Sequence, residues 1–297
     1  MSSISRSQLV KELEPGLHAL FGLEYKRWER EHAEIFTENN SDRAFEEETL
    51  LSGFGAAPTK AEGGSVEFDT ASEQWTARYV HETIALAFSV TEEAVEDNLY
   101  DTLSKRYTAA LARSMAYTKQ VKAANVLNNG FSSSYVGGDG KAMITTDHPT
   151  LAAGDLANEP STASDLSETS LESAIISIGG FVDDRNVPVA VNARKLIIPK
   201  DLAFTAQRIL KSDLRVGTAD NDTNALRQMN ILPQGYAVNH YLTDTDAWFI
   251  LTDLINSGLT MFQRRPLKTS RNMRFKASER YSFGWSDWRA IFGSPGA

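Results

Sequence analysis

Residues 75–90 read WTARYVHETIALAFSV, and residues 91–128 continue as TEEAVEDNLYDTLSKRYTAALARSMAYTKQVKAANVLN. In the first segment the side chains alternate with a period of two, so that Ile84 and Phe88 share one parity and Tyr79 falls on the other. Alternation among aromatic and β-branched residues is typical of a strand. The sequence therefore predicts one long strand over Trp75–Val90.

The second segment has the spacing of an amphipathic helix. Thr91 is a favourable N-cap, acidic residues follow it at the positive end of the helix, and Asn129 and Gly130 form a stop signal. No proline interrupts Thr91–Asn128. At ~1.5 Å per residue this helix would be roughly 57 Å long, whereas a compact chain of this size is about 50 Å across. We therefore expect a flattened molecule built on a spine helix, or a kink that divides the segment into two helices.

Composition excludes several classes of protein. The 297 residues contain no cysteine, which excludes disulfide scaffolds, thiolate metal sites and cysteine nucleophiles. The net charge of −9 argues against binding of nucleic acid by a global positive field. There is no apolar run of about 18 residues, so we expect no membrane span. The first residues lack a hydrophobic segment, so we expect no secretory signal.

The charge is distributed unevenly along the chain. Arg264–Arg289 carries eight Lys or Arg against two acids, whereas Glu24–Glu48 carries nine acids against four bases. Asymmetry of this kind favours two surfaces that meet. We hypothesise that the acidic segment of one copy pairs with the basic strip Arg264–Arg280 of another. The same strip could hold phosphate, but its aromatic residues fall on the parity opposite to its arginines, which indicates a buried face instead.

The segments that flank the spine also have recognisable patterns. Met1–Phe36 contains one or two amphipathic helices broken at Pro15–Gly16, too charged to form a core alone. Thr49–Glu73 is rich in glycine and predicts a long mobile β-hairpin, with a solvated linker as the alternative. Leu259–Phe292 is rich in strands, and Phe275, Ala277, Glu279 and Tyr281 share the parity expected to be buried.

The middle of the chain predicts an α/β or α+β layer with long loops. A helix is expected around Leu171–Ile178, and a second is expected to begin at Asp201. Short buried strands are expected at Lys195–Pro199 and Trp248–Leu251.

Candidates for chemistry are few. Asp147 and His148 are adjacent and form a weak signal for an acid–base or metal site. His81 and Glu82 would point to opposite faces of a strand. The other histidines, His18, His32 and His240, have no partners at zinc-ligand spacing. No phosphate-binding glycine motif and no nucleophile elbow is present. We therefore predict no catalytic, cofactor-binding or metal-binding residue.

Several stretches, in their order along the chain, resemble the major capsid protein of tailed bacteriophages with the Hong Kong 97-type fold, and are most similar to Mu-like head subunits. No single stretch is diagnostic, but together they cover nearly the whole chain. They are Ile35–Glu47, Gly53–Gly63, Trp75–Thr83, Thr91–Tyr100, Asp147–Pro149 and Gly284–Arg289.

The resemblance implies an α+β fold in five parts. These are an N-terminal arm (1–48), an extended β-hairpin loop (49–78), a peripheral domain with the spine helix (79–134), an axial domain (135–250) and the returning strands of the peripheral domain (251–297). It also implies self-assembly into hexamers and pentamers of an icosahedral shell that encloses double-stranded DNA without sequence-specific binding. The virion capsid would assemble in the host cytoplasm.

The resemblance and the charge pattern together nominate contacts between subunits. The nominated residues are Glu46, Glu47, Glu48, Phe54, Lys60, Arg264, Arg265, Lys268 and Arg271. Relatives with a long N-terminal scaffolding segment differ from this short arm, so a separate scaffolding protein and a portal protein are expected partners. Some relatives crosslink lysine to asparagine through the extended loop; Lys60 lies in that loop, but no asparagine and acid partner is identifiable.

Three alternatives remain open at this point. An encapsulin-like nanocompartment would share the fold and enclose cargo enzymes. A soluble hydrolase would use Asp147 and His148 and would run as a small monomer with a stoichiometric metal. A tail or baseplate protein would share the lack of catalytic groups but not the order of the stretches.

Overall fold

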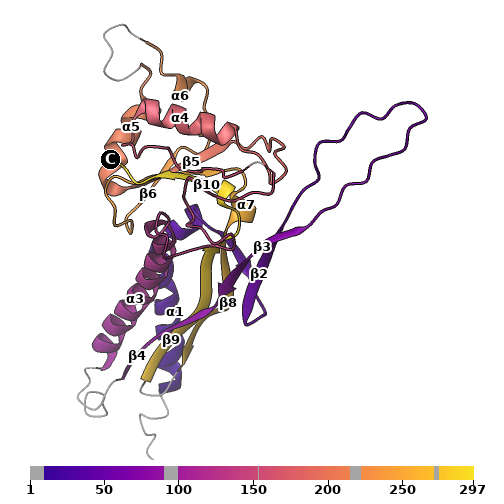
Figure 1. Ribbon diagram of the computed structural model, residues 1–297. Helices are drawn as coiled ribbons and strands as arrows, with labels where there is room; N and C mark the ends of the chain where they lie inside the picture. The colour runs from indigo at the N-terminus through magenta and orange to yellow at the C-terminus, as the bar shows by residue number, and fades with distance from the viewer. Residues whose placement is uncertain (1–9, 90–99, 153, 215–221, 271–273) are drawn as a thin grey trace, which may run out of the picture.

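The structure is a computed structural model of the 297-residue chain, described here at residues 10–89, 100–152, 154–214, 222–270 and 274–297. Two four-stranded sheets form its two halves, and a two-stranded hairpin extends to one side (Figure 1). The long helix α3 runs beside the lower sheet, whereas α4, α5 and α6 cover the upper one. The α+β fold class expected from the sequence is confirmed.

The first sheet has the order β1-β8-β9-β4. Its strands are β1 (Thr37–Asn40), β8 (Leu259–Ser270), β9 (Arg274–Trp285) and β4 (Glu82–Ser89). β1 is parallel to β8, and the other pairs are antiparallel. The sheet therefore joins residues near the start of the chain to residues near its end.

The second sheet has the order β10-β7-β5-β6. Its strands are β10 (Ile291–Ser294), β7 (Trp248–Thr252), β5 (Ala193–Pro199) and β6 (Tyr236–Asn239). β7 is buried at every residue, and β5 at its last four, so the two strands predicted at these places are confirmed. The helices packed around this sheet are α4 (Glu168–Gly179), η3 (Lys200–Leu202), α5 (Ala203–Lys211) and α6 (Ala225–Gln228).

The prediction of a single strand over Trp75–Val90 is wrong. β3 (Glu73–Val80) pairs with β2 (Phe45–Leu51) in the hairpin, while β4 pairs with β9 in the first sheet. His81 separates the two strands, and its ring contacts the hydroxyls of Ser41 and Ser282 at 3.0 Å each. The buried parity also changes at this residue, because β3 buries Tyr79 whereas β4 packs Ile84 inward. In the sequence Val80, Ile84 and Phe88 share one parity, so the apolar alternation runs on through the break and could not reveal it.

The spine helix α3 (Tyr100–Asn128) is one continuous helix over its described length. Its predicted start at Thr91 lies outside the described residues. It ends where predicted: a Cβ on Gly130 would lie 2.9 Å from Met143 Cε and 3.0 Å from the carbonyl of Leu127, so glycine fits the close approach at the stop. α3 packs against β9 and β4 of the first sheet and against α1.

The amphipathic segment at the start of the chain forms α1 (Val10–Arg27), followed by η2 (Glu31–Glu34). The expected break at Pro15–Gly16 is wrong, because the backbone stays helical through both residues. A proline removes one helical hydrogen bond. Phe21 of α1 is buried in a cluster with Leu111 and Met115 of α3, so packing on the spine offsets that loss.

Candidate functional site

The segment Gly284–Arg289, called the junction below, begins with the last two residues of β9 and leads to β10, so it carries the chain from the first sheet to the second. Its first residues pass through tight spaces. A Cβ on Gly284 would lie 2.7 Å from the ring of Tyr79, and a Cβ on Gly137 would lie 2.1 Å from the ring of Trp285. The two glycines therefore allow the hairpin and the loop after α3 to approach this junction closely.

Ser286 fastens the hairpin to the junction. Its hydroxyl lies 2.5 Å from the phenol oxygen of Tyr79 in a buried position and donates a hydrogen bond to the carboxylate of Glu48. Burial raises the pKa of Tyr79, so the phenol stays protonated and available as a donor. Both strands of the hairpin are thus tied to the same serine.

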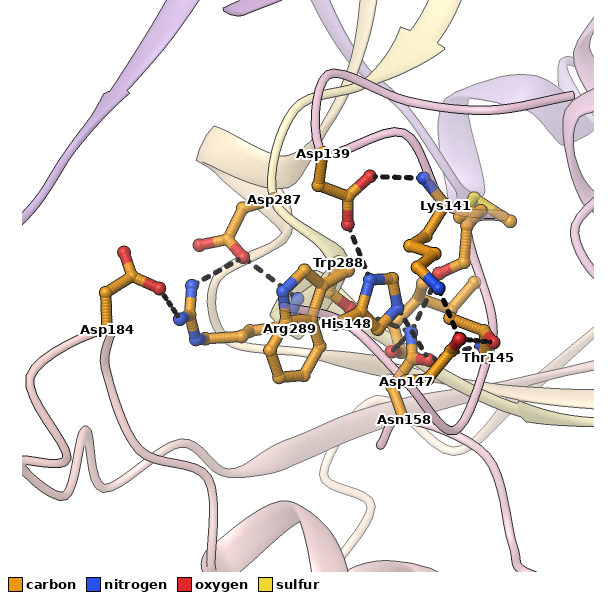
Figure 2. Close-up of polar contacts among 12 residues, drawn as sticks. Asp139, Lys141, Thr145, Asp147, His148, Asn158, Asp184, Asp287, Trp288 and Arg289 are labelled. Atoms are coloured by element: carbon orange, nitrogen blue, oxygen red, sulfur yellow. Dashed lines mark hydrogen bonds and ion pairs between the residues drawn. The ribbon is translucent and has the colours of Figure 1, made fainter. Parts of the chain in front are cut away.

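The indole ring of Trp288 lies between the imidazole of His148 and the guanidinium of Arg289 (Figure 2). The ring of His148 stacks on it at 4.6 Å and 6°, and the guanidinium of Arg289 lies 4.6 Å from its centroid. His148 Nδ1 lies 2.7 Å from the carboxylate of Asp139, and both side chains are fully buried. This arrangement holds the loop after α3 against the junction.

Asn158 completes the contact of His148 with the second sheet. Its amide nitrogen donates to the carbonyls of Met143, Trp288 and Ile291, at 2.9, 3.2 and 3.1 Å. Its amide oxygen therefore faces His148 Nε2, at 3.2 Å, and that nitrogen donates. Both nitrogens of the histidine ring are engaged in structural hydrogen bonds.

Arg289 ends the segment in a buried ion pair with Asp184, at 2.8 Å, with 4% of each side chain exposed. Its Nε also donates to the carbonyl of Val182, at 2.9 Å, and its second guanidinium nitrogen lies 3.2 Å from Asp287. Removal of either partner of a buried pair leaves a costly uncompensated charge. The pair therefore keeps Arg289 and Asp184 together and fixes the geometry of the junction.

The residues proposed for an alternative hydrolase do not act as a pair. Asp147 pairs with Lys141 and accepts from the hydroxyl of Thr145 at 2.6 Å, and Lys141 holds the pKa of Asp147 below its usual value. His148 turns to Asp139 instead and is sealed from solvent (Figure 2). A general base needs access to its substrate, so this cluster is a structural joint. Within the described ranges, no three acidic or histidine side chains converge as a metal site.

The remaining histidines are also accounted for where the structure describes their side chains. His32 is buried beside Gln120 and Glu38, His81 is buried between two serines, and His240 pairs with Glu31 at 2.8 Å on the surface.

The nominated acidic residues lie on β2 and mostly contact their own chain. Glu46 accepts from the hydroxyl of Ser41 at 2.7 Å, and Glu48 contacts Ser286. Glu47 is about half exposed and lies 3.7 Å from Arg78 across the hairpin. Of the three, Glu47 is the most accessible to a second subunit.

Of the nominated basic residues, Arg264, Arg265 and Lys268 lie on β8. Arg264 and Arg265 are half-buried, and Arg265 donates to the hydroxyl of Ser278 at 3.3 Å. Lys268 is exposed, and Arg271 lies outside the described residues. Lys268 is therefore the member of this strip that is best placed for an external contact.

Phe54 and Lys60 both lie in the loop that joins β2 to β3, and both are exposed. Figure 1 shows this loop, residues 52–72, extending away from the body of the molecule. Its base is held by residues that the sequence analysis missed: Arg185 donates to the carbonyl of Thr70 at 2.5 Å and lies 3.8 Å from Asp69. Because Arg185 follows Asp184, the loop base and the junction are braced by the same turn.

A further buried ion pair ties the spine to the first sheet. Lys119 of α3 lies 3.3 Å from Glu279 of β9, with 7% and 1% of the side chains exposed.

None of the described helices is long and apolar enough to cross a membrane.

Comparison with known proteins bears on this architecture. The family described as phage capsid protein matches residues 75–293. The capsid of the native GTA particle has 15% sequence identity and a TM-score of 0.54, with 91% of this chain and 92% of that chain covered. The Mycobacterium phage Che8 structure has 15% identity and a TM-score of 0.50, with coverage of 88% and 89%. A search of curated proteins gives no match.

At this identity the solved structures establish the fold, which is the Hong Kong 97-type fold expected from the sequence. The family match spans most of the chain and includes α3, the junction and most of both sheets, with β1 outside it. The polar cluster at the junction lies within the part of the chain that the family model matches. This chain belongs to the phage capsid protein family and is a structural protein of a capsid shell.

Proposed function

We propose that copies of this chain assemble into hexamers and pentamers, and that these close into an icosahedral shell around double-stranded DNA. Identical subunits that present complementary surfaces form closed symmetric assemblies when the rotation between neighbours closes. In this proposal the shell assembles in the host cytoplasm and becomes the capsid of the virion.

The exposed extended loop is the observation that carries the proposal. Leu51 and Phe54 are 65% and 63% exposed, and Val66 and Phe68 are 63% and 96% exposed. A monomeric protein rarely presents so many apolar side chains on one projecting segment. Contact with a neighbouring subunit would remove them from water. The arm differs from the loop, because α1 lies on the spine helix of its own chain.

The five-part division belongs to this proposal. Residues 1–48 form the arm, 49–78 the extended loop, and 135–250 the axial domain, with the peripheral domain formed by 79–134 and 251–297. One adjustment follows from the pairing of strands, since β10 lies beside β7 in the second sheet. The last strand is therefore assigned to the axial part.

We further propose that the chain performs no catalysis and needs no cofactor, because the most reactive cluster, around His148, is closed to solvent. A separate scaffolding protein and a portal protein are the expected partners during assembly. The net charge of −9 argues against attraction of DNA by a global positive field, so in this proposal the DNA is enclosed without sequence-specific contacts.

Electron microscopy of the purified protein, with and without its scaffolding protein, tests the proposal. Closed shells or rings of five and six subunits are the expected result. A protein that stays monomeric under both conditions, with its extended loop protected from protease, would contradict it. Nuclease treatment of shells from infected cells distinguishes packaged DNA from the enzyme cargo of an encapsulin-like compartment.

A further inference from the structure

The distal part of the extended loop presents a distinct pattern of side chains. A turn at Ala61–Gly64 closes the loop, with a hydrogen bond of 3.0 Å from the amide of Gly64 to the carbonyl of Ala61. Beyond the turn, apolar Val66 and Phe68 alternate with acidic residues. Phe68 is 96% exposed, so its ring contacts almost nothing in its own chain.

A pocket of about 450 Å³ lies elsewhere in the molecule, between the C-terminal part of α3, β9 and the loop that follows α3. Its mouth is apolar, because Val80, Tyr135 and Val136 line it and are 63%, 60% and 55% exposed. Lys122 and Glu82 also line the pocket, and they pair with each other. This volume falls within the range of roughly 300–1,000 Å³ that is usual for ligand pockets.

We propose that this pocket receives the loop segment Val66–Phe68 of a second copy of the chain, with the ring of Phe68 inside it. The inference rests on the proposed function and assigns the docking site within it. The two features suit each other, because the segment offers an exposed aromatic ring and the mouth of the pocket is lined by apolar side chains.

Charge complementarity supports this occupant over an uncharged one. Glu67 lies between the two apolar residues of the segment, and Lys122 lines the pocket; Lys60 precedes the turn, and Glu82 also lines the pocket. Docking would therefore exchange the Lys122–Glu82 pair for two pairs between copies. Exposed pairs contribute little to affinity but fix register.

The reach of the loop supports a second copy over the same one. Residues 52–72 form two legs of about ten residues, so the turn can stand roughly 33 Å from the base of the hairpin. The loop leads away from the body of its own chain (Figure 1). The segment is thus presented outward, where a neighbour's pocket can meet it.

The absence of cysteine makes a direct test possible, because any disulfide must come from introduced residues. The variant Glu67→Cys/Asn125→Cys places one thiol in the segment and one on an exposed position of α3 that lines the pocket. Oxidation of its assembled shells is expected to give a ladder of covalent multimers. The matched control Glu67→Cys/Tyr117→Cys has its second thiol on the same helix but outside the pocket, and is expected to give none.

A second test measures assembly. Phe68→Ala removes a ring that is 96% exposed in the subunit, so the fold is preserved. Loss of one buried aromatic ring weakens each contact by about thirtyfold. We expect the protein concentration needed for assembly to rise at least about tenfold. Asn125→Trp, which fills the pocket from an exposed position, should have a similar effect, whereas Tyr117→Trp should not.

The outcomes separate this inference from the proposed function. Shells that form normally but give no ladder with the first cysteine pair, or that tolerate both Phe68→Ala and Asn125→Trp, would overturn the docking site and leave the shell intact. A ladder from the control pair alone would place the segment elsewhere on α3 and would overturn it too. If the unmodified chain forms no shell at all, the proposed function itself fails.

Discussion

His32 should make this subunit less stable in mild acid. The ring is 2% exposed, and burial together with the neighbouring Lys119 lowers its pKa from 6.5 to about 4. In the unfolded chain the same ring takes up a proton near pH 6.5. Between pH 6.5 and pH 4 the unfolded state therefore binds more protons than the folded state. The free energy of unfolding falls as the pH is lowered through this range. The contribution is complete above pH 6.5.

The magnitude follows from the two pKa values. Between about pH 7 and pH 4.5, the difference in proton binding lowers the free energy of unfolding by about 2 kcal/mol. His81 adds to the loss in the wild-type chain, because burial and the nearby Arg280 also lower its pKa. Burial opposes but does not cancel the effect of Arg30, which lowers the pKa of Glu38. The stability that Glu38 provides is therefore lost only at lower pH.

The variant His32→Gln isolates this share, since its side chain carries no charge at either pH. Urea unfolding of unassembled subunits at several pH values gives the free energy of unfolding for both proteins. We expect the wild type to lose about 2 kcal/mol more than the variant between about pH 7 and pH 4.5. If the two curves run parallel, the ring is not held neutral by its surroundings and the reasoning is refuted.

Other predictions concern the Lys119–Glu279 ion pair, the junction and the basic strip. Lys119→Met should lower the free energy of unfolding by about 3–5 kcal/mol, while Lys119→Met with Glu279→Met should recover most of the loss; additive effects in the double-mutant cycle would argue against a buried pair. Trp288→Ala should cost about 3–5 kcal/mol in the same urea assay, and a loss below about 1 kcal/mol would mean that the junction is loosely packed. Lys268→Glu should slow assembly without changing stability, which light scattering measures; normal assembly would exclude this residue from the contact.

Much of the fold could be predicted from local patterns. The spine helix and the strands at Trp248 and Lys195 follow from apolar spacing, and the structure confirms them. The hairpin loop followed from its glycines. These elements are encoded by residues close together in the sequence, so a pattern within one segment suffices to find them.

The break at His81 could not be predicted, because it depends on hydroxyl groups from distant segments. Ser41 and Ser282 lie 40 and 201 residues away and hold the ring where the chain passes from the hairpin to the first sheet. Likewise, Asn158 lies in a polar loop and looks like any turn residue. Its role depends on three carbonyls that only the folded chain brings together.

The need for one buried ion pair could have been predicted from the sequence. Glu279 falls on the buried parity of its strand, between alanine and tyrosine, and a buried carboxylate requires a cation. Lys119 is that cation, and it lies on the predicted spine helix. A charged residue within an apolar alternation therefore signals an ion pair, even when its partner stays unknown.

The pairing of β1 with β8 has a consequence for synthesis on the ribosome. Thr37 aligns with Thr260, so the first sheet joins parts of the chain more than two hundred residues apart. At about 5–20 residues per second, roughly 11 to 45 seconds separate the translation of these two strands. Until the later strand emerges, a nascent chain lacks its completed sheet, and translation thereby delays entry of the newborn subunit into a growing particle.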